Sequence, residues 1–232
     1  MRSSSAFSTL VLDHPELSQD GAAARERAES LLRRACASNP FDPLPLGSLA
    51  SFLWTQYKHH ARHEADDLYQ RALQADPTNS DTLSGYANFQ WRAHECLDDA
   101  IEYYQRSIDI NPGNFRTLAN FSQLLFLADD RGRAKKFATT VTRSSTNDVL
   151  RLEAYFYLFA HDRSPDADQY VKDLKKLLLA GVRSPGWDLA PTVKAAESVR
   201  HSNINLLRAI AGVIGNLSEI SVLEEFSAWT RN

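Results

Sequence analysis

The segment Glu64–Pro77, EADDLYQRALQADP, recurs further along the chain as Asp99–Pro112, DAIEYYQRSIDINP. The two copies share their Ala, Tyr, Gln-Arg and Pro positions, and the offset from Ala65 to Ala100 is 35 residues. Each copy has the apolar spacing of an amphipathic helix and closes on a proline, which stops a helix. A fixed period of this length indicates an array of repeated helical units.

A second kind of helical segment lies between these copies. Thr82–Trp91 (TLSGYANFQW) matches Pro45–Trp54 (PLGSLASFLW) before it and Thr117–Phe126 (TLANFSQLLF) after it. Its anchor leucine recurs at Leu46, Leu83, Leu118 and Leu152, in steps of 37, 35 and 34 residues. We call these segments first-type helices and the segments of the preceding paragraph second-type helices. The sequence therefore predicts paired helices that alternate between the two types.

These segments resemble the tetratricopeptide repeat (TPR) family. The resemblance is carried by Leu83-x2-Tyr86-Ala87, Ala100-x3-Tyr104 and Pro112, and by the matching set Leu46-x2-Leu49-Ala50, Ala65-x3-Tyr69-x2-Ala72 and Pro77. It covers about residues 22–180 and weakens in the last two repeats. It implies an all-α fold: a right-handed α-α superhelix of about four to five helical hairpins with a C-terminal helical cap.

The expected domain organisation follows from where the period begins and ends. Residues 1–21 are Ser-rich and predict a loose N-terminal arm, residues 22–180 form the repeat array, and residues 181–232 have no repeat signature. An open repeat array needs a cap with a polar outer side, so we assign the last region that role. Three helices are predicted there, over Pro191–His201, Asn203–Ile214 and Glu219–Trp229. Within the array, Asp81 is the expected N-cap of its helix, and Pro165 is expected to open another.

Composition excludes several classes of partner. The 26 basic and 29 acidic residues give a net charge of −3 without a basic block, which argues against nucleic acid and acidic membrane surfaces. No apolar run approaches the length of a membrane span. Cys36 and Cys96 have no motif spacing, so we expect two reduced thiols in a cytoplasmic protein.

The resemblance also implies a binding surface, because stacked first-type helices line a concave groove in this family. With the anchor leucine counted as the fourth place, the groove-facing places are the second, fifth, ninth, twelfth and thirteenth. Glu153 occupies the fifth place of its helix, and Ser51 the ninth place of another. The predicted peptide-binding residues are Trp54, Asn88, Trp91, Arg92, Arg116, Asn120, Gln123, Phe126 and Tyr157.

Asn88 and Asn120 occupy the places where family members that clamp a chaperone's C-terminal carboxylate carry Asn. Their amides can hold a peptide backbone by hydrogen bonds. The Lys of that clamp is Ser84 here, and its basic pair falls on Leu150 and Ala154. Because a carboxylate needs cationic donors, the carboxylate clamp is the least favoured interpretation. Solvated side chains are the favoured one, and general contact with a peptide backbone is the alternative.

Trp54, Trp91 and Phe126 form one column, twelfth in successive first-type helices. Aromatic anchors in a groove are typical of interface hot spots. Packing between neighbouring first-type helices explains the same column equally well, so both interpretations stay open.

The sequence predicts a non-enzymatic adaptor or scaffold that binds a peptide or helix of another protein in its groove. No nucleotide-binding or nucleophile motif occurs, and no cofactor or metal is expected. His59 and His63 are four residues apart without a third ligand, which favours a polar loop over a zinc site. The alternative is a structural subunit that assembles through its convex face or C-terminal helices, which would make homo-oligomers.

Overall fold

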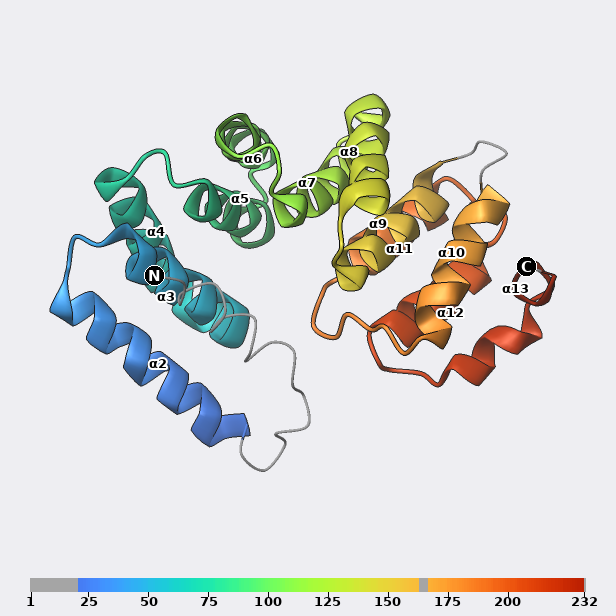
Figure 1. Ribbon diagram of the computed structural model, residues 1–232, viewed down its shortest axis with the longest axis horizontal. Helices are drawn as coiled ribbons and strands as arrows, with labels where there is room; N and C mark the ends of the chain where they lie inside the picture. Colours follow the sequence, from blue (N-terminus) through green and yellow to red (C-terminus); the bar gives the residue numbers. More distant parts are fainter. Residues whose placement is uncertain (1–20, 163–166, 232) are drawn as a thin grey trace. The chain divides into compact units, whose positions relative to one another are not determined.

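The computed structural model describes residues 21–162 and 167–231 (Figure 1). The predicted arm over residues 1–21, apart from its last residue, and the expected helix start at Pro165 lie outside the described residues. The chain divides into two compact units, Met1–Gly113 and Asn114–Asn232, which we call the N-terminal unit and the C-terminal unit. Within the described ranges every regular element is helical, and no helix is long and apolar enough to cross a membrane.

In its described residues, 21–113, the N-terminal unit has one helix, α2, ahead of two helical hairpins. α2 packs against α3, α3 pairs with α4, and α5 pairs with α6, while α5 also contacts α3 and α4. The elements are α2 (Gly21–Ser38), α3 (Pro43–Tyr57), the 3-10 turn η1 (Lys58–Ala61), α4 (Arg62–Ala75), α5 (Ser80–His94) and α6 (Leu97–Ile110). The first-type and second-type segments thus alternate as predicted, and α2 is a second-type helix that precedes the first complete pair.

The C-terminal unit continues the alternation and then departs from it. α7 pairs with α8 and α9 with α10, and α7 also contacts α9. The elements are α7 (Phe115–Leu127), α8 (Arg131–Ser144), α9 (Asp148–His161), α10 (Ala167–Leu179), α11 (Ala190–Ser198), α12 (Ile204–Ile214), the 3-10 segment η2 (Ile220–Glu225) and α13 (Ser227–Thr230). The third helix predicted in this region is wrong as a single element. Phe226 has extended backbone angles (φ −100°, ψ 119°), which separate η2 from α13.

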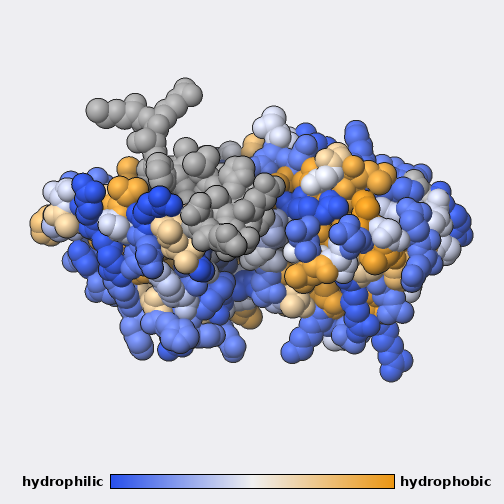
Figure 2. Space-filling model, turned by 90° about the horizontal axis from the view of Figure 1, so that it is seen from below, coloured by the Kyte–Doolittle hydropathy of each residue, from blue (hydrophilic) through white to orange (hydrophobic). Residues whose placement is uncertain are grey.

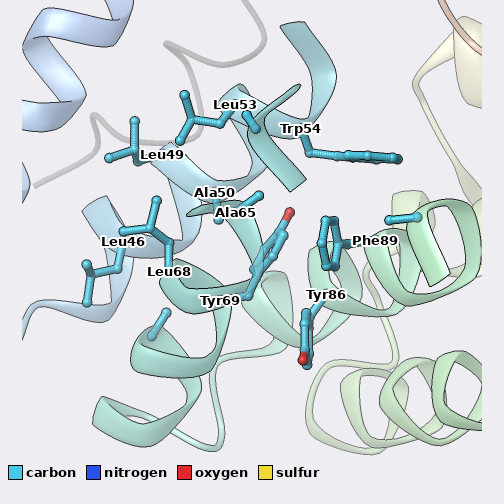
Figure 3. Packing of buried hydrophobic residues seen from close by; sticks show 13 residues of the cluster. Leu46, Leu49, Ala50, Leu53, Trp54, Ala65, Leu68, Tyr69, Tyr86 and Phe89 are labelled. Carbon is cyan, nitrogen blue, oxygen red and sulfur yellow. The ribbon is translucent and has the colours of Figure 1, made fainter. Parts of the chain in front are cut away.

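The core of the N-terminal unit is built from the repeated small, aliphatic and aromatic positions. Tyr69 of α4 lies between Ala65 on its own helix and Tyr86 and Phe89 of α5, with ring centroids 5.4 Å and 5.6 Å away (Figure 3). The aliphatic part of the cluster comes from α3 and α4 and comprises Leu46, Leu49, Leu53 and Leu68. The positions that repeat in the sequence are thus the ones that fill the space between paired helices.

Close approach of the helices depends on residues with little or no side chain. Ala65, Ala100 and Ala134, at matching places of three second-type helices, are completely buried. A Cβ atom at Gly47 of α3 would lie 2.7 Å from the side-chain oxygen of Thr82 on α5. Such a contact is too short, so α3 and α5 approach at a distance that only glycine permits at this place.

Asparagine side chains cap the N-termini of three first-type helices. Asn79, Asn114 and Asn147 each accept a hydrogen bond from a backbone N–H in the first turn of α5, α7 and α9. The expectation that Asp81 caps α5 is wrong, because Asp81 lies within the first turn and Asn79 is the cap. The negative charge of Asp81 at that place still favours the helix N-terminus electrostatically.

Replacing Ala100 by Trp should destabilise the N-terminal unit. Overpacking a filled helix interface costs about 1–3 kcal/mol, which lowers the melting temperature of a chain this size by a few degrees. Thermal unfolding followed by circular dichroism measures the effect, with Glu102→Trp, at an exposed place on the same helix, as the matched control. Equal melting temperatures for the two variants would contradict this account of helix pairing.

Candidate functional site

The predicted binding residues divide between the two units, so each unit is considered by itself. Trp54, on α3, and Asn88, Trp91 and Arg92, on α5, belong to the N-terminal unit. The C-terminal unit holds Arg116, Asn120, Gln123 and Phe126, on α7, and Tyr157, on α9. The ninth place of the first-type helices, which the family resemblance directs into the groove, is Asn88 in α5, Gln123 in α7 and Tyr157 in α9.

Gln123 is completely buried and holds a segment of its own chain. Its Nε2 donates hydrogen bonds to the backbone oxygen of Asp188 and to Oγ1 of Thr192, both at 3.1 Å. Asp188 lies in the loop between α10 and α11, and Thr192 lies in the first turn of α11. The amide of Gln123, which was expected to contact a ligand in the groove, thus binds its own chain. Its acceptors are a backbone carbonyl 65 residues away and a hydroxyl 69 residues away.

Tyr157 is also completely buried and contacts the same loop. The indole Nε1 of Trp187 donates a hydrogen bond to the Tyr157 hydroxyl oxygen at 2.5 Å. The sequence interpretation placed Tyr157 in an open groove. The structure instead places it beneath Trp187, which ties the loop to α9 through the polar edge of its ring.

Glu153, at the fifth place of α9, makes the third contact to the loop. Ser184 Oγ donates a hydrogen bond to Glu153 Oε1 at 2.5 Å, and both residues are buried. Burial raises the pKa of Glu153 to about 7, while the Ser184 hydrogen bond and the charge of Arg116 act in the opposite direction. The backbone N–H of Ser184 donates to the Ile214 oxygen, so α12 also supports this end of the loop.

These contacts define one surface, formed by the fifth and ninth places of α7 and α9, which we call the α7/α9 face. The segment Ser184–Thr192 covers it, and α11 packs against both helices (Figure 1). An open groove was expected at Gln123 and Tyr157, and the structure differs because the loop and α11 fold back onto these helices. Sequence reasoning gave the region after residue 180 a capping role and expected Trp187 to fix its loop to the core, which the structure shows. It missed Ser184 and Thr192 as contacts.

The aromatic column lies largely in the seams between helices. Trp54 is 6% exposed and meets Phe89 of α5 edge to face, with ring centroids 5.2 Å apart (Figure 3). Phe126 stacks on His161 of α9 with centroids 4.7 Å apart, and burial lowers the pKa of His161 to about 4, so its ring is neutral. Of the two interpretations left open by the sequence, packing between first-type helices is what the structure has for Trp54 and Phe126.

α5 presents a different arrangement of the predicted residues. Trp91 and Arg92 follow Asn88 by three and four residues, so both lie near Asn88 on the same side of the helix. The Arg92 guanidinium carbon lies 3.9 Å from the centroid of the Trp91 ring. Asn88 Oδ1 is buried, and within residues 21–162 and 167–231 no donor reaches it. A buried acceptor without a donor is unfavourable by about 1–3 kcal/mol, so this place on α5 is chemically incomplete.

Arg116 and Asn120 occupy the remaining predicted places on α7. Arg116 is exposed, and its charge is the source of the small electrostatic effect on Glu153. Asn120 is 9% exposed, in a helix where most residues are buried. Neither side chain touches the Ser184–Thr192 segment through a contact that the structure shows.

The structure is similar to the solved structure of pilF from Pseudomonas aeruginosa, a TPR-containing protein. The TM-score is 0.56 at 18% sequence identity, and the match covers 98% of this chain and 95% of the other. The fold is tetratricopeptide-like. No protein-family model and no curated protein matches the sequence. At this identity the similarity speaks for the fold and leaves function to the residues of this chain.

The buried Glu153 predicts a pH dependence of stability with a definite sign. The unfolded chain ionises Glu153 near pH 4.5, whereas the folded chain does so near pH 7. The folded state therefore binds more protons between these values, and the associated stability, present below pH 4.5, is lost as pH rises through 7. The shift corresponds to roughly 3 kcal/mol.

Glu153→Gln should flatten this part of the stability profile. Urea unfolding of wild type and variant between pH 4.5 and pH 8 measures the difference in the free energy of unfolding. Glu102→Gln, which changes an exposed carboxylate, should keep the wild-type slope. A Glu153→Gln profile parallel to that of wild type would show that Glu153 ionises in its ordinary range.

Proposed function

We propose that this protein is a non-enzymatic scaffold that binds a segment of a partner protein along the groove-facing side of its first-type helices. The helical-hairpin fold supports the general class, since it is shared with the TPR-containing pilF. The observation that carries the proposal is on α5, where the amide oxygen of Asn88, beside Trp91 and Arg92, is buried and has no donor among the described residues. A backbone N–H of a bound polypeptide supplies that donor once the side chains that cover the oxygen move aside.

The three side chains have complementary chemistry for such a ligand. Asn88 provides a hydrogen-bond acceptor for the partner's backbone. The ring of Trp91 beside it is 8% exposed and is of the kind that dominates interface energetics when a partner covers it. The guanidinium of Arg92 stacks on that ring and carries a charge that an acidic or carbonyl-rich segment can neutralise. Together they favour an extended or helical peptide with at least one free backbone N–H.

Asn88→Ala should weaken binding of the partner protein without destabilising the fold. Because Asn88 Oδ1 has no donor within the described chain, its loss should leave the melting temperature unchanged or slightly raised. Loss of a central interface contact costs about 2 kcal/mol or more, so partner recovery should fall at least tenfold. Affinity purification from the source cell, quantified by mass spectrometry, measures that recovery.

The matched control is Asn111→Ala, which removes an amide at an exposed place after α6. The double variant Asn88→Ala/Trp91→Ala extends the test, provided that its circular dichroism spectrum equals that of wild type. The proposal fails if a partner bound by wild type is recovered equally well with folded Asn88→Ala and with the folded double variant.

A second candidate function is assembly with further copies of the chain, and exposed leucines support it. Leu179, the last residue of α10, is 62% exposed, and Leu217, which follows α12, is 85% exposed. Figure 2 shows hydrophobic residues at the surface of the C-terminal unit. Where such residues form a contiguous patch, apolar surface is a common mark of protein interfaces.

Leu179→Asp/Leu217→Asp tests assembly. If these leucines join two copies, the variant should be monomeric where wild type is dimeric or larger, because a buried unpaired carboxylate opposes association. Mass photometry or light scattering after size exclusion measures the mass over a range of concentrations. Wild type that is monomeric throughout, or a variant of equal mass, would rule out assembly through these leucines.

A further inference from the structure

The α7/α9 face is covered by a segment of its own chain, and the contacts resemble those between a binding site and a peptide ligand. Side chains of two first-type helices provide the fixed groups, namely Gln123, Glu153 and Tyr157. The covering segment, Ser184–Thr192, provides a backbone carbonyl, two hydroxyls and an indole N–H. Both backbone and side-chain groups are thus recognised, as in complexes of peptides with helical repeats.

The fixed groups specify the chemistry of the ligand. Glu153 accepts a hydrogen bond from a hydroxyl, and Tyr157 accepts one from an indole N–H. In the resident segment the hydroxyl and the indole belong to Ser184 and Trp187, three residues apart. Gln123 donates to a backbone oxygen of the residue after the Trp. A segment with the pattern Ser/Thr-x-x-Trp therefore satisfies Glu153 and Tyr157 and gives Gln123 a backbone acceptor. A hydroxyl five residues after the Trp, as in Thr192, supplies the second acceptor of Gln123.

The resident segment is joined to the fold at its two ends and is open to solvent between them. Ser184 and Leu189 are buried, whereas Pro185, Gly186 and Asp188 are exposed. Gly186 has a positive φ of 86° and no atom within 4 Å of the place where a Cβ would lie. The segment therefore rests on the face through its hydrogen bonds, the ring of Trp187 and the buried side chains of Leu189 and Thr192, contacts that an equivalent segment can reproduce.

We propose that the α7/α9 face is a peptide-binding site occupied by the chain's own Ser184–Thr192 segment, which a partner segment with the pattern Ser/Thr-x-x-Trp replaces. This inference rests on the proposed function and names the chemistry of the partner. Exchange conserves the hydrogen bonds of the face when the partner segment also carries a hydroxyl at the place of Thr192, because each group then changes one donor or acceptor for another of the same kind. The buried groups Gln123 and Glu153 are therefore never left unpaired in either bound state.

The test supplies the segment in trans. A fluorescent peptide with the sequence of residues 182–193, VRSPGWDLAPTV, is titrated into wild type and into Ser184→Ala/Trp187→Ala. The variant keeps the face and weakens its resident segment, so it should bind the peptide at least about tenfold more tightly than wild type does, measured by fluorescence anisotropy. Adding Tyr157→Phe, which removes one acceptor of the face, should reduce that binding.

The control peptide carries Ala in place of its Ser and its Trp and should not bind. The inference is overturned if the folded variant fails to bind the wild-type peptide, or binds both peptides equally. If Ser184→Ala/Trp187→Ala does not fold, hydrogen exchange of wild type decides. Amides of residues 186–189 should exchange at a lower free energy than those of α9, and exchange of both only on global unfolding overturns the inference.

The two proposals can fail separately. Peptide binding in trans together with an Asn88→Ala variant that keeps its partner would leave the α7/α9 face as a site and refute the role of α5. Loss of the partner in Asn88→Ala without peptide binding in trans would do the reverse, and Ser184–Thr192 would then be a fixed part of the fold.

Discussion

Helix pairing at close range is the constraint from which the other features follow. Ala65, Ala100 and Ala134 are completely buried where second-type helices meet their partners, and Gly47 leaves no room even for a methyl group beside Thr82. With the helices this close, the large side chains Tyr69 and Phe89 fill the remaining core at a small number of places. Because these places are fixed along each helix, the sequence must repeat, and the places left over face away from the pair. Those remaining places are the ones available for binding.

The helices could be predicted from the sequence where their signals are local, namely the spacing of apolar residues and the residues at the helix ends. Helix α6 spans Leu97–Ile110 as expected, since its apolar period and its closing Asn-Pro are local signals. The N-cap of α5 was misplaced by two residues because Asn79 and Asp81 both suit a helix start, and only the hydrogen bond to the Thr82 N–H distinguishes them. The helix predicted over Glu219–Trp229 failed because an extended residue, Phe226, interrupts an apolar spacing that a helix also satisfies. The predicted domain boundaries at residues 21 and 180 stay a prediction.

The contacts of the α7/α9 face lay beyond sequence reasoning for a physical reason. Gln123 meets Thr192 across 69 residues, and Glu153 meets Ser184 across 31. No local period carries such information, because the segment after α10 has no repeat against which to be compared. One signal was present: Glu153 and Gln123 are polar residues on helices that are otherwise largely apolar, so each needs a partner wherever it is buried. From that requirement it follows that some polypeptide segment must cover the face. It does not follow whether the segment belongs to the same chain or to another.

The two units meet that requirement in opposite ways, which is why the roles proposed for them differ. In α7 the ninth-place amide of Gln123 has both of its acceptors within the chain, and the aromatic edge of Trp187 closes the neighbouring place on α9. In α5 the ninth-place amide of Asn88 has an oxygen that no described donor reaches, although Trp91 and Arg92 stand beside it. A polar group that is buried and unpaired raises the free energy of the isolated chain, whereas a ligand that pairs it recovers that free energy on binding. Under the proposed function, the α5 surface gains from a partner, while the proposed α7/α9 site only exchanges one occupant for another. The proposed binding at α5 then depends on the partner's affinity alone, and that at α7/α9 depends on the difference in affinity between the partner and Ser184–Thr192.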